Sequence, residues 1–157
     1  EKVLMSLETD DAEEIKELLS YEDESVGSIM NKDFISFNIE LSVGETLELL
    51  RDLNADEEVM NYVYITDNND RLKGVVTLRD LILNQEKEKI TNIMHTLGIN
   101  VKIDNNIGEA AEIAIKYDLI SIPVVDYEEK LVGIVLIHDI LDELLPHSWK
   151  KKFKKAN

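Results

Sequence analysis

The sequence predicts a mixed α/β fold built from two copies of one small unit, and two observations support this prediction. The first is an internal repeat, because residues 67–80 (DNNDRLKGVVTLRD) recur in altered form at residues 126–139 (DYEEKLVGIVLIHD). Five positions are identical between the two segments, and a match of this density indicates a duplicated unit. The second is the hydrophobic pattern, which changes between strand and helix periods in the same order in each copy.

Each copy is expected to contain a strand, a helix, two further strands and a closing helix. Polar turn residues separate the second and third strands of each copy. Strands are predicted at residues 34–37, 62–66 and 72–76, and again at 100–103, 122–125 and 131–136. Helical spacing follows the first strand of each copy, at Val43, Leu47 and Leu50 and at Ile107, Ala110, Ala111 and Ala114.

Apolar stripes mark the two closing helices. A three-stranded sheet with helices on one face needs a partner for its other face, so the copies are expected to pack about a pseudo-two-fold axis. Clefts at such junctions are common ligand sites. The second stripe offers a surface for another copy of the chain, and a homodimer is expected. The stripes comprise Leu78, Leu81 and Ile82 in the first copy and Ile137, Ile140, Leu141 and Leu144 in the second.

Composition narrows the classes of function. The chain has 157 residues, of which 44% are hydrophobic, which is enough for a core. Its 33 acidic and 17 basic residues give a formal charge of -16, which disfavours nucleic acid and favours cations as partners. With no cysteine, disulfides and thiolate zinc sites are excluded, and a reducing, cytosolic setting is expected. No apolar run approaches the roughly 20 residues that span a bilayer, so a soluble chain is expected.

A Gly-hydrophobic-hydrophobic-Thr-x-x-Asp motif at residues 74–80 enters the closing helix of the first copy. With the duplicated order of elements, this motif closely resembles a pair of CBS (cystathionine-beta-synthase-type) domains over residues 28–145. Residues 18–30, 75–80 and 117–126 further resemble the cytosolic portion of MgtE-type magnesium transporters. The resemblance implies a regulatory module and not an enzyme, at the cytoplasmic face of the membrane. Its implied partners are a second copy and the transmembrane domain of a parent protein.

The resemblance also implies how the chain is divided. Residues 1–24 would be the end of a helical N-terminal domain, residues 25–88 and 89–145 the two CBS repeats, and residues 146–157 a basic tail. Asp10 and Glu13 suggest a capping box in the first of these segments. In the tail, Trp149 and Phe153 lie among lysines, which suits a membrane interface, although a soluble tail or a dimer contact fits equally well. The MgtE pattern continues after the last CBS helix with glutamates and aspartates that help to bind gating magnesium, and the basic tail of this chain departs from it.

Thr77 and Asp80 are the candidate nucleotide ligands. A carboxylate suits the two hydroxyls of a ribose, while a hydroxyl and helix N-terminal amides suit phosphate. The same Thr-x-x-Asp pattern also caps a helix and needs no ligand. The resemblance implies a site for an adenine nucleotide (ATP, ADP or AMP) on Thr77, Arg79, Asp80, Leu119, Ile122 and Pro123. Leu136 replaces the threonine in the second copy, so one site is expected.

Magnesium is the second expected ligand. The ion takes carboxylate and water oxygens, which an acidic chain supplies. The resemblance points to Asp118, Asp139 and Asp142, with Glu22 and Asp23 as looser candidates; the alternative is a solvated acidic face. The three histidines lack ligand spacing, and no nucleophilic motif is recognisable. Two functions remain: a magnesium- and nucleotide-responsive regulator of an MgtE-type transporter, or a soluble or differently fused adenine-nucleotide sensor with no magnesium channel.

Overall fold

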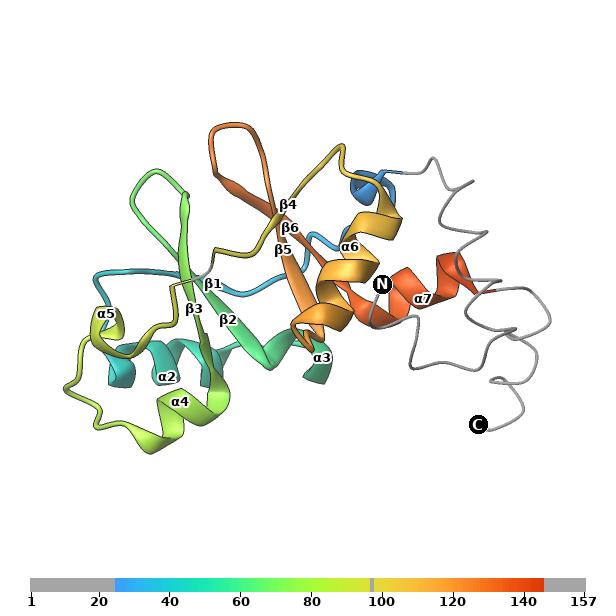
Figure 1. The fold of residues 1–157 in the computed structure, drawn as a ribbon. Helices are drawn as coiled ribbons and strands as arrows, with labels where there is room; N and C mark the ends of the chain where they lie inside the picture. Colours follow the sequence, from blue (N-terminus) through green and yellow to red (C-terminus); the bar gives the residue numbers. More distant parts are fainter. Residues whose placement is uncertain (1–24, 97, 146–157) are drawn as a thin grey trace, which may run out of the picture. The chain divides into compact units, whose positions relative to one another are not determined.

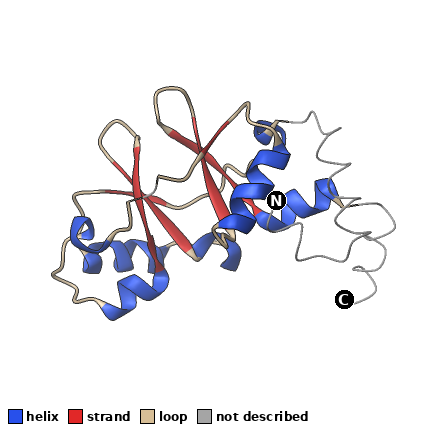
Figure 2. Ribbon diagram, viewed as in Figure 1, coloured by secondary structure: helices blue, strands red, loops and turns tan. Residues whose placement is uncertain are grey.

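The computed structural model describes residues 25–96 and 98–145, which form two three-stranded sheets flanked by short helices (Figures 1 and 2). This confirms the mixed α/β class and the repeated order of elements. The first repeat contains η2 (Val26–Ser28), β1 (Ser36–Asn38), α2 (Val43–Asp52), α3 (Glu57–Met60), β2 (Tyr62–Thr66), β3 (Leu72–Thr77) and α4 (Leu78–Leu83). The second contains α5 (Ile90–Ile93), β4 (Val101–Lys102), α6 (Ile107–Lys116), β5 (Ser121–Val125), β6 (Leu131–Leu136) and α7 (Ile137–Leu144).

The strand order is β1-β2-β3 in one sheet and β4-β5-β6 in the other. In the first sheet β1 runs parallel to β2, with Ser36 opposite Tyr64, and β2 runs antiparallel to β3, with Tyr62 opposite Thr77. Parallel pairing requires a crossover, which α2 provides between β1 and β2. This register places Thr77 at the end of β3, immediately before α4.

Helix α2 begins where its capping residues predict. The Ser42 side chain accepts from the backbone N–H of Glu45, and the Glu45 carboxylate accepts from the backbone N–H of Ser42. Such a reciprocal capping box satisfies two N–H groups that the helix itself cannot satisfy. The helix therefore starts at Val43, and its buried residues Val43, Thr46 and Leu50 face the sheet core.

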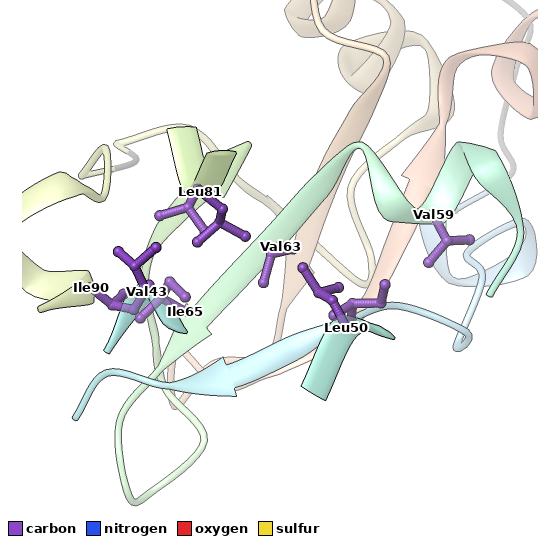
Figure 3. Close-up of a cluster of buried hydrophobic side chains, with 9 residues drawn as sticks. Val43, Leu50, Val59, Val63, Ile65, Leu81 and Ile90 are labelled. Carbon is purple, nitrogen blue, oxygen red and sulfur yellow. The ribbon is translucent and has the colours of Figure 1, made fainter. Parts of the chain in front are cut away.

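One core covers the helix-facing side of the first sheet. Figure 3 shows Val63 and Ile65 of β2 pointing toward the side chains of α2 and α4. Because successive side chains of a strand point to opposite faces, Val63 and Ile65 share one face and Tyr64 lies on the other. The buried residues of this cluster are Ile35, Val43, Leu50, Val59, Val63, Ile65, Val76, Leu81 and Ile90.

The described chain divides into two compact units that do not coincide with the two sequence repeats. The first unit comprises residues 31–100 together with 123–134, and the second comprises 25–30, 101–122 and 135–145 of the described residues. Within the first unit, the hairpin turn of the second repeat bonds to that of the first. Leu72 N donates to Glu129 O and Leu131 N donates to Asp70 O, both at 3.0 Å. Each compact unit therefore contains segments of both repeats.

The second unit contains α6 and α7, which pack against each other. On α7, Ile140 is fully buried and Leu144 nearly so, whereas Leu141 is 39% exposed. The expectation that Ile140, Leu141 and Leu144 together form a free surface for a second copy is therefore wrong. An i, i+4 pair such as Ile140 and Leu144 shares one helix face, and this face is used inside the chain.

Several short elements differ from the sequence-based expectations. Helices α3 and α5 and the 3-10 turn η2 are too short for helical periodicity to reveal. The strand predicted at 34–37 is observed as β1, which pairs with β2 from Ser36 to Asn38. None of the described helices is long and apolar enough to cross a bilayer. The proposed capping box at Asp10 and Glu13 and the basic tail lie outside the described residues.

Candidate functional site

Thr77 and Asp80 bond to each other at the junction of β3 and α4. Asp80 N donates to Thr77 Oγ1 at 3.1 Å, and Thr77 N donates to Asp80 Oδ2 at 3.0 Å. The capping arrangement that the spacing allowed is therefore present. Because the Asp80 amide is already bonded and α4 has only six residues, the helix N-terminus gives little support to the expected phosphate contact.

A third side chain completes the cluster, and sequence reasoning missed it. His95 Nε2 lies 3.0 Å from Asp80 Oδ2. His95 is held there by its backbone, because Val75 N donates to His95 O at 3.0 Å and His95 N donates to Val75 O at 2.8 Å. Asp80 thus accepts hydrogen bonds from residues on both sides of it in the sequence.

A repeated tripeptide could have pointed to this position. Ile29-Met30-Asn31 and Ile93-Met94-His95 each precede the first strand of a repeat. In the structure, Asn31 forms a bridge with Ile134 and His95 forms a bridge with Val75, and these two strand residues are equivalent in the internal repeat. The polar residue after each Ile-Met pair is therefore placed beside a third strand.

The Asp80 carboxyl group is held in its ionised form. Burial raises its pKa, but hydrogen bonds from the Thr77 backbone and hydroxyl, together with His95, outweigh burial and lower the pKa below its ordinary value. The side chain remains 25% exposed. An ionised, partly exposed carboxylate is a strong acceptor for hydroxyl groups.

The other expected nucleotide ligands belong to two different units. Arg79 is exposed on α4 and Pro123 is buried in β5, and both belong to the first unit with Thr77 and Asp80. Leu119, partly buried, and Ile122, fully buried, belong to the second unit. Burial limits what Ile122 and Pro123 can offer to a ligand. Of the six expected nucleotide ligands, Thr77 and Asp80 are the two that hydrogen-bond to each other.

Tyr62 stands directly opposite Thr77 in the β2–β3 ladder. Opposite residues of an antiparallel pair project on the same face, so the Tyr62 ring lies on the Thr77 side of the sheet. A separate pocket of about 390 Å³ lies in the first unit, near the hairpin turns, with Ser36, Thr66, Asp126 and Lys130 in its lining. Neither Thr77 nor Asp80 lines that pocket.

The expected magnesium ligands form no cage. Asp118 follows α6 with a φ of 53°, a conformation that aspartate adopts at helix ends. Asp139 Oδ1 lies 3.1 Å from His138 Nε2, and the exposed Asp142 lies three residues further along α7. Within residues 25–96 and 98–145, no three His, Cys, Asp or Glu side chains gather as a metal site.

Asp139 and Asp142 nevertheless share a helix face, because residues three apart on a helix are neighbours. Magnesium usually keeps several of its waters and takes only one or two carboxylates from a protein. If a hydrated ion of this kind bound here, Asp139 and Asp142 are the residues whose carboxylates would hold it. Glu22 and Asp23 lie outside the described residues.

The fold, with its repeated order of strands and helices, defines a tandem-repeat module. The family model of the CBS domain matches residues 26–87 and 90–146, and the chain belongs to the CBS domain family. It is similar to the magnesium transporter MgtE of Enterococcus faecalis, with 38% identity over 134 residues, and to that of Thermus thermophilus, with 37% over 131 residues. These matches cover 85% and 83% of this chain but only 30% and 29% of the transporters.

Solved structures agree with this assignment. The cytosolic domain of the Mg²⁺ channel MgtE in complex with ATP matches with a TM-score of 0.73 and 34% identity, over 88% of this chain and 56% of that domain. A CBS domain pair in complex with 5′-methylthioadenosine and S-adenosyl-L-methionine matches with a TM-score of 0.62 and 30% identity, over 76% of this chain and 98% of that pair. Both complexes hold adenosine-containing ligands.

Proposed function

We propose that the chain is the nucleotide-responsive regulatory part of an MgtE-type magnesium transporter. The likeness to MgtE over most of the chain supports the transporter assignment. In this proposal the chain is not an enzyme. It acts at the cytoplasmic face of the membrane as a homodimer and passes ligand occupancy to the transmembrane domain of its parent protein.

The ionised, partly exposed carboxylate of Asp80 is the observation that supports nucleotide binding in this proposal. Each carboxylate oxygen has two lone pairs for hydrogen bonds. Thr77 N and His95 Nε2 both bond to Oδ2, and in this proposal Oδ1 accepts from the ligand. An adenine nucleotide offers the hydroxyls of its ribose, and charge-assisted bonds to them would be strong.

The two repeats differ in a way that favours one nucleotide site. Thr77 caps α4 and orders Asp80, whereas Leu136 at the start of α7 makes no side-chain cap. Asp139, the equivalent of Asp80, pairs with the neighbouring His138 instead. We therefore assign nucleotide binding to the first repeat. Magnesium would be held by Asp139 and Asp142 and by carboxylates such as Asp118.

Thermal unfolding tests this function. A ligand that binds the native state alone raises the melting temperature by mass action. ATP, ADP and AMP should raise it in a saturating manner, whereas equal concentrations of inorganic triphosphate should not. If none of the three nucleotides changes the melting temperature, Thr77 and Asp80 are a helix cap and the nucleotide part of the proposal is wrong. Stabilisation by nucleotide in a parent protein without membrane spans would favour the sensor that has no channel.

A further inference from the structure

The bond between His95 and Asp80 occupies the carboxylate oxygen that the second hydroxyl of a bound ribose would use. An ionised carboxylate only accepts hydrogen bonds, so His95 Nε2 is the donor in the 3.0 Å contact with Asp80 Oδ2. Oδ2 also accepts from Thr77 N at 3.0 Å. These two bonds use both lone pairs of Oδ2.

A ribose carries two neighbouring hydroxyls. The first can donate to Oδ1, but a geometry with one hydroxyl on each oxygen needs Oδ2, which His95 already fills. The His95 backbone does not have to move for the imidazole to leave, because the two bonds to Val75 hold the main chain only. The His95 side chain is 64% exposed and has space to turn toward solvent.

Among the described residues, the helices and strand next to this contact carry few other charges. Strand β3 carries Lys73, whose Nζ lies 3.7 Å from Asp67 Oδ2, and the residues of α5 carry no titratable side chain. Helix α4 contributes Arg79, which is exposed, and Asp80 itself. The titratable side chain in contact with the imidazole, among the described residues, is therefore Asp80.

We propose that His95 competes with the ribose of a bound adenine nucleotide for the Asp80 carboxylate and so sets nucleotide affinity according to pH. This inference rests on the proposed function. A protonated imidazole makes a charge-assisted bond to a carboxylate, about twice as strong as a neutral one. Because imidazole groups in general carry a proton in mild acid and lose it in mild alkali, competition is strongest in mild acid, and nucleotide affinity rises from about pH 5.5 to about pH 8.

His95→Ala tests the proposal by titration calorimetry with ATP and 2′-deoxy-ATP, which carry the same triphosphate but differ by one ribose hydroxyl. Removing a competing hydrogen bond should tighten ATP binding by about 3- to 10-fold at pH 5.5 and much less at pH 8. The gain should be smaller for 2′-deoxy-ATP, which does not need the second acceptor. His138→Ala, which removes an exposed histidine from the other repeat, should leave both affinities unchanged.

Weaker ATP binding in His95→Ala, or an unchanged dependence on pH, would overturn the proposal while leaving nucleotide binding intact. If the unmodified parent chain binds no nucleotide, the proposed function is wrong and the competition proposal fails with it. Carbon NMR of the Asp80 carboxyl group checks the contact without a nucleotide. Because His95 is among the groups that lower the pKa of Asp80, this pKa should rise in His95→Ala. If it does not rise, the contact is absent in solution and the proposal fails.

Discussion

Gly74 of β3 approaches the main chain of His95 so closely that a Cβ on the glycine would lie 2.8 Å from the His95 carbonyl oxygen. Val75 N donates to this same oxygen, so the close approach and the bridge between β3 and the segment after α5 occur together. Any side chain at position 74 would push against backbone that cannot turn aside. The glycine therefore keeps His95 beside Asp80.

Gly74→Ala is expected to destabilise the chain by about 1–3 kcal/mol, because the added methyl group overpacks a fixed contact. Gly98→Ala is the matched control, since a Cβ there meets nothing within 4 Å. It should change the free energy of unfolding by less than about 0.5 kcal/mol. Chemical denaturation measures both. Equal stability of the two variants would contradict the close approach.

Thr77→Ala should cost about 1 kcal/mol of stability, because the Asp80 amide loses its capping acceptor. Thr91→Ala, which removes an exposed threonine that caps no helix, should cost less. Urea denaturation without nucleotide separates this structural role from ligand binding. A Thr77→Ala variant as stable as the parent chain would show that the cap contributes nothing.

Acid should weaken the fold in part through Asp80. The pKa of Asp80 is lowered in the folded chain, because its hydrogen bonds outweigh the opposing effect of burial. A carboxyl group with a lowered folded pKa stabilises the protein above its unfolded pKa, near 4, and this contribution is lost as the pH falls through the folded value. Asp80→Asn should therefore flatten the fall in stability below about pH 4. Identical acid dependence in the two proteins would contradict this account.

A homodimer remains expected, although not through Ile140 and Leu144. Exposed apolar side chains instead include Ile82 and Leu83 on α4, which are 65% and 68% exposed. Replacing both with glutamate should lower the mass in solution from dimer to monomer, as measured by light scattering. Tyr127→Glu, at an exposed hairpin turn, is the control and should stay dimeric. A monomeric mass for the parent chain at high protein concentration would contradict the homodimer prediction.

Magnesium should raise the melting temperature more than sodium at matched ionic strength. The chain carries a formal charge of -16, and coordination relieves repulsion that simple screening relieves only in part. Joint replacement of Asp118, Asp139 and Asp142 by Asn should reduce this magnesium-specific increment.

A second triple variant controls for net charge in the magnesium experiment. Glu48→Gln, Asp52→Asn and Asp56→Asn also remove three exposed charges, but from the first unit. This variant should keep most of the magnesium-specific increment. If both triple variants lose the magnesium-specific increment in melting temperature equally, magnesium acts through the total charge of the chain. If the parent chain gives equal melting curves in magnesium and in sodium, the chain has no specific magnesium site.

The sequence predicted the long elements well and the short ones poorly. Strands β2 and β6 begin and end where expected, because polar turns bound runs of β-branched residues. The four-residue helices α3 and α5 were not predicted, because a single helical turn is too short to show a hydrophobic periodicity. The buried face of α7 was misjudged because a stripe does not reveal which partner covers it.

The candidate site was predictable only where it is local in sequence. Thr77 and Asp80 are three residues apart, and their spacing alone suggested the reciprocal hydrogen bonds. His95 lies fifteen positions beyond Asp80, and the contact arises from a backbone bridge to β3 that no local pattern encodes. Leu119 and Ile122 belong to another unit, so their part in a site depends on tertiary placement.

Titration calorimetry with ATP, on the parent chain, Asp80→Asn and Asp139→Asn, tests the central claim most directly. Both substitutions remove one carboxylate charge at equivalent positions of the two repeats, and asparagine keeps an oxygen that can accept from the backbone. The account predicts one ATP per chain in the parent and in Asp139→Asn, with affinity lowered at least about tenfold in Asp80→Asn. Binding that survives intact in Asp80→Asn, or is lost in Asp139→Asn instead, would contradict it.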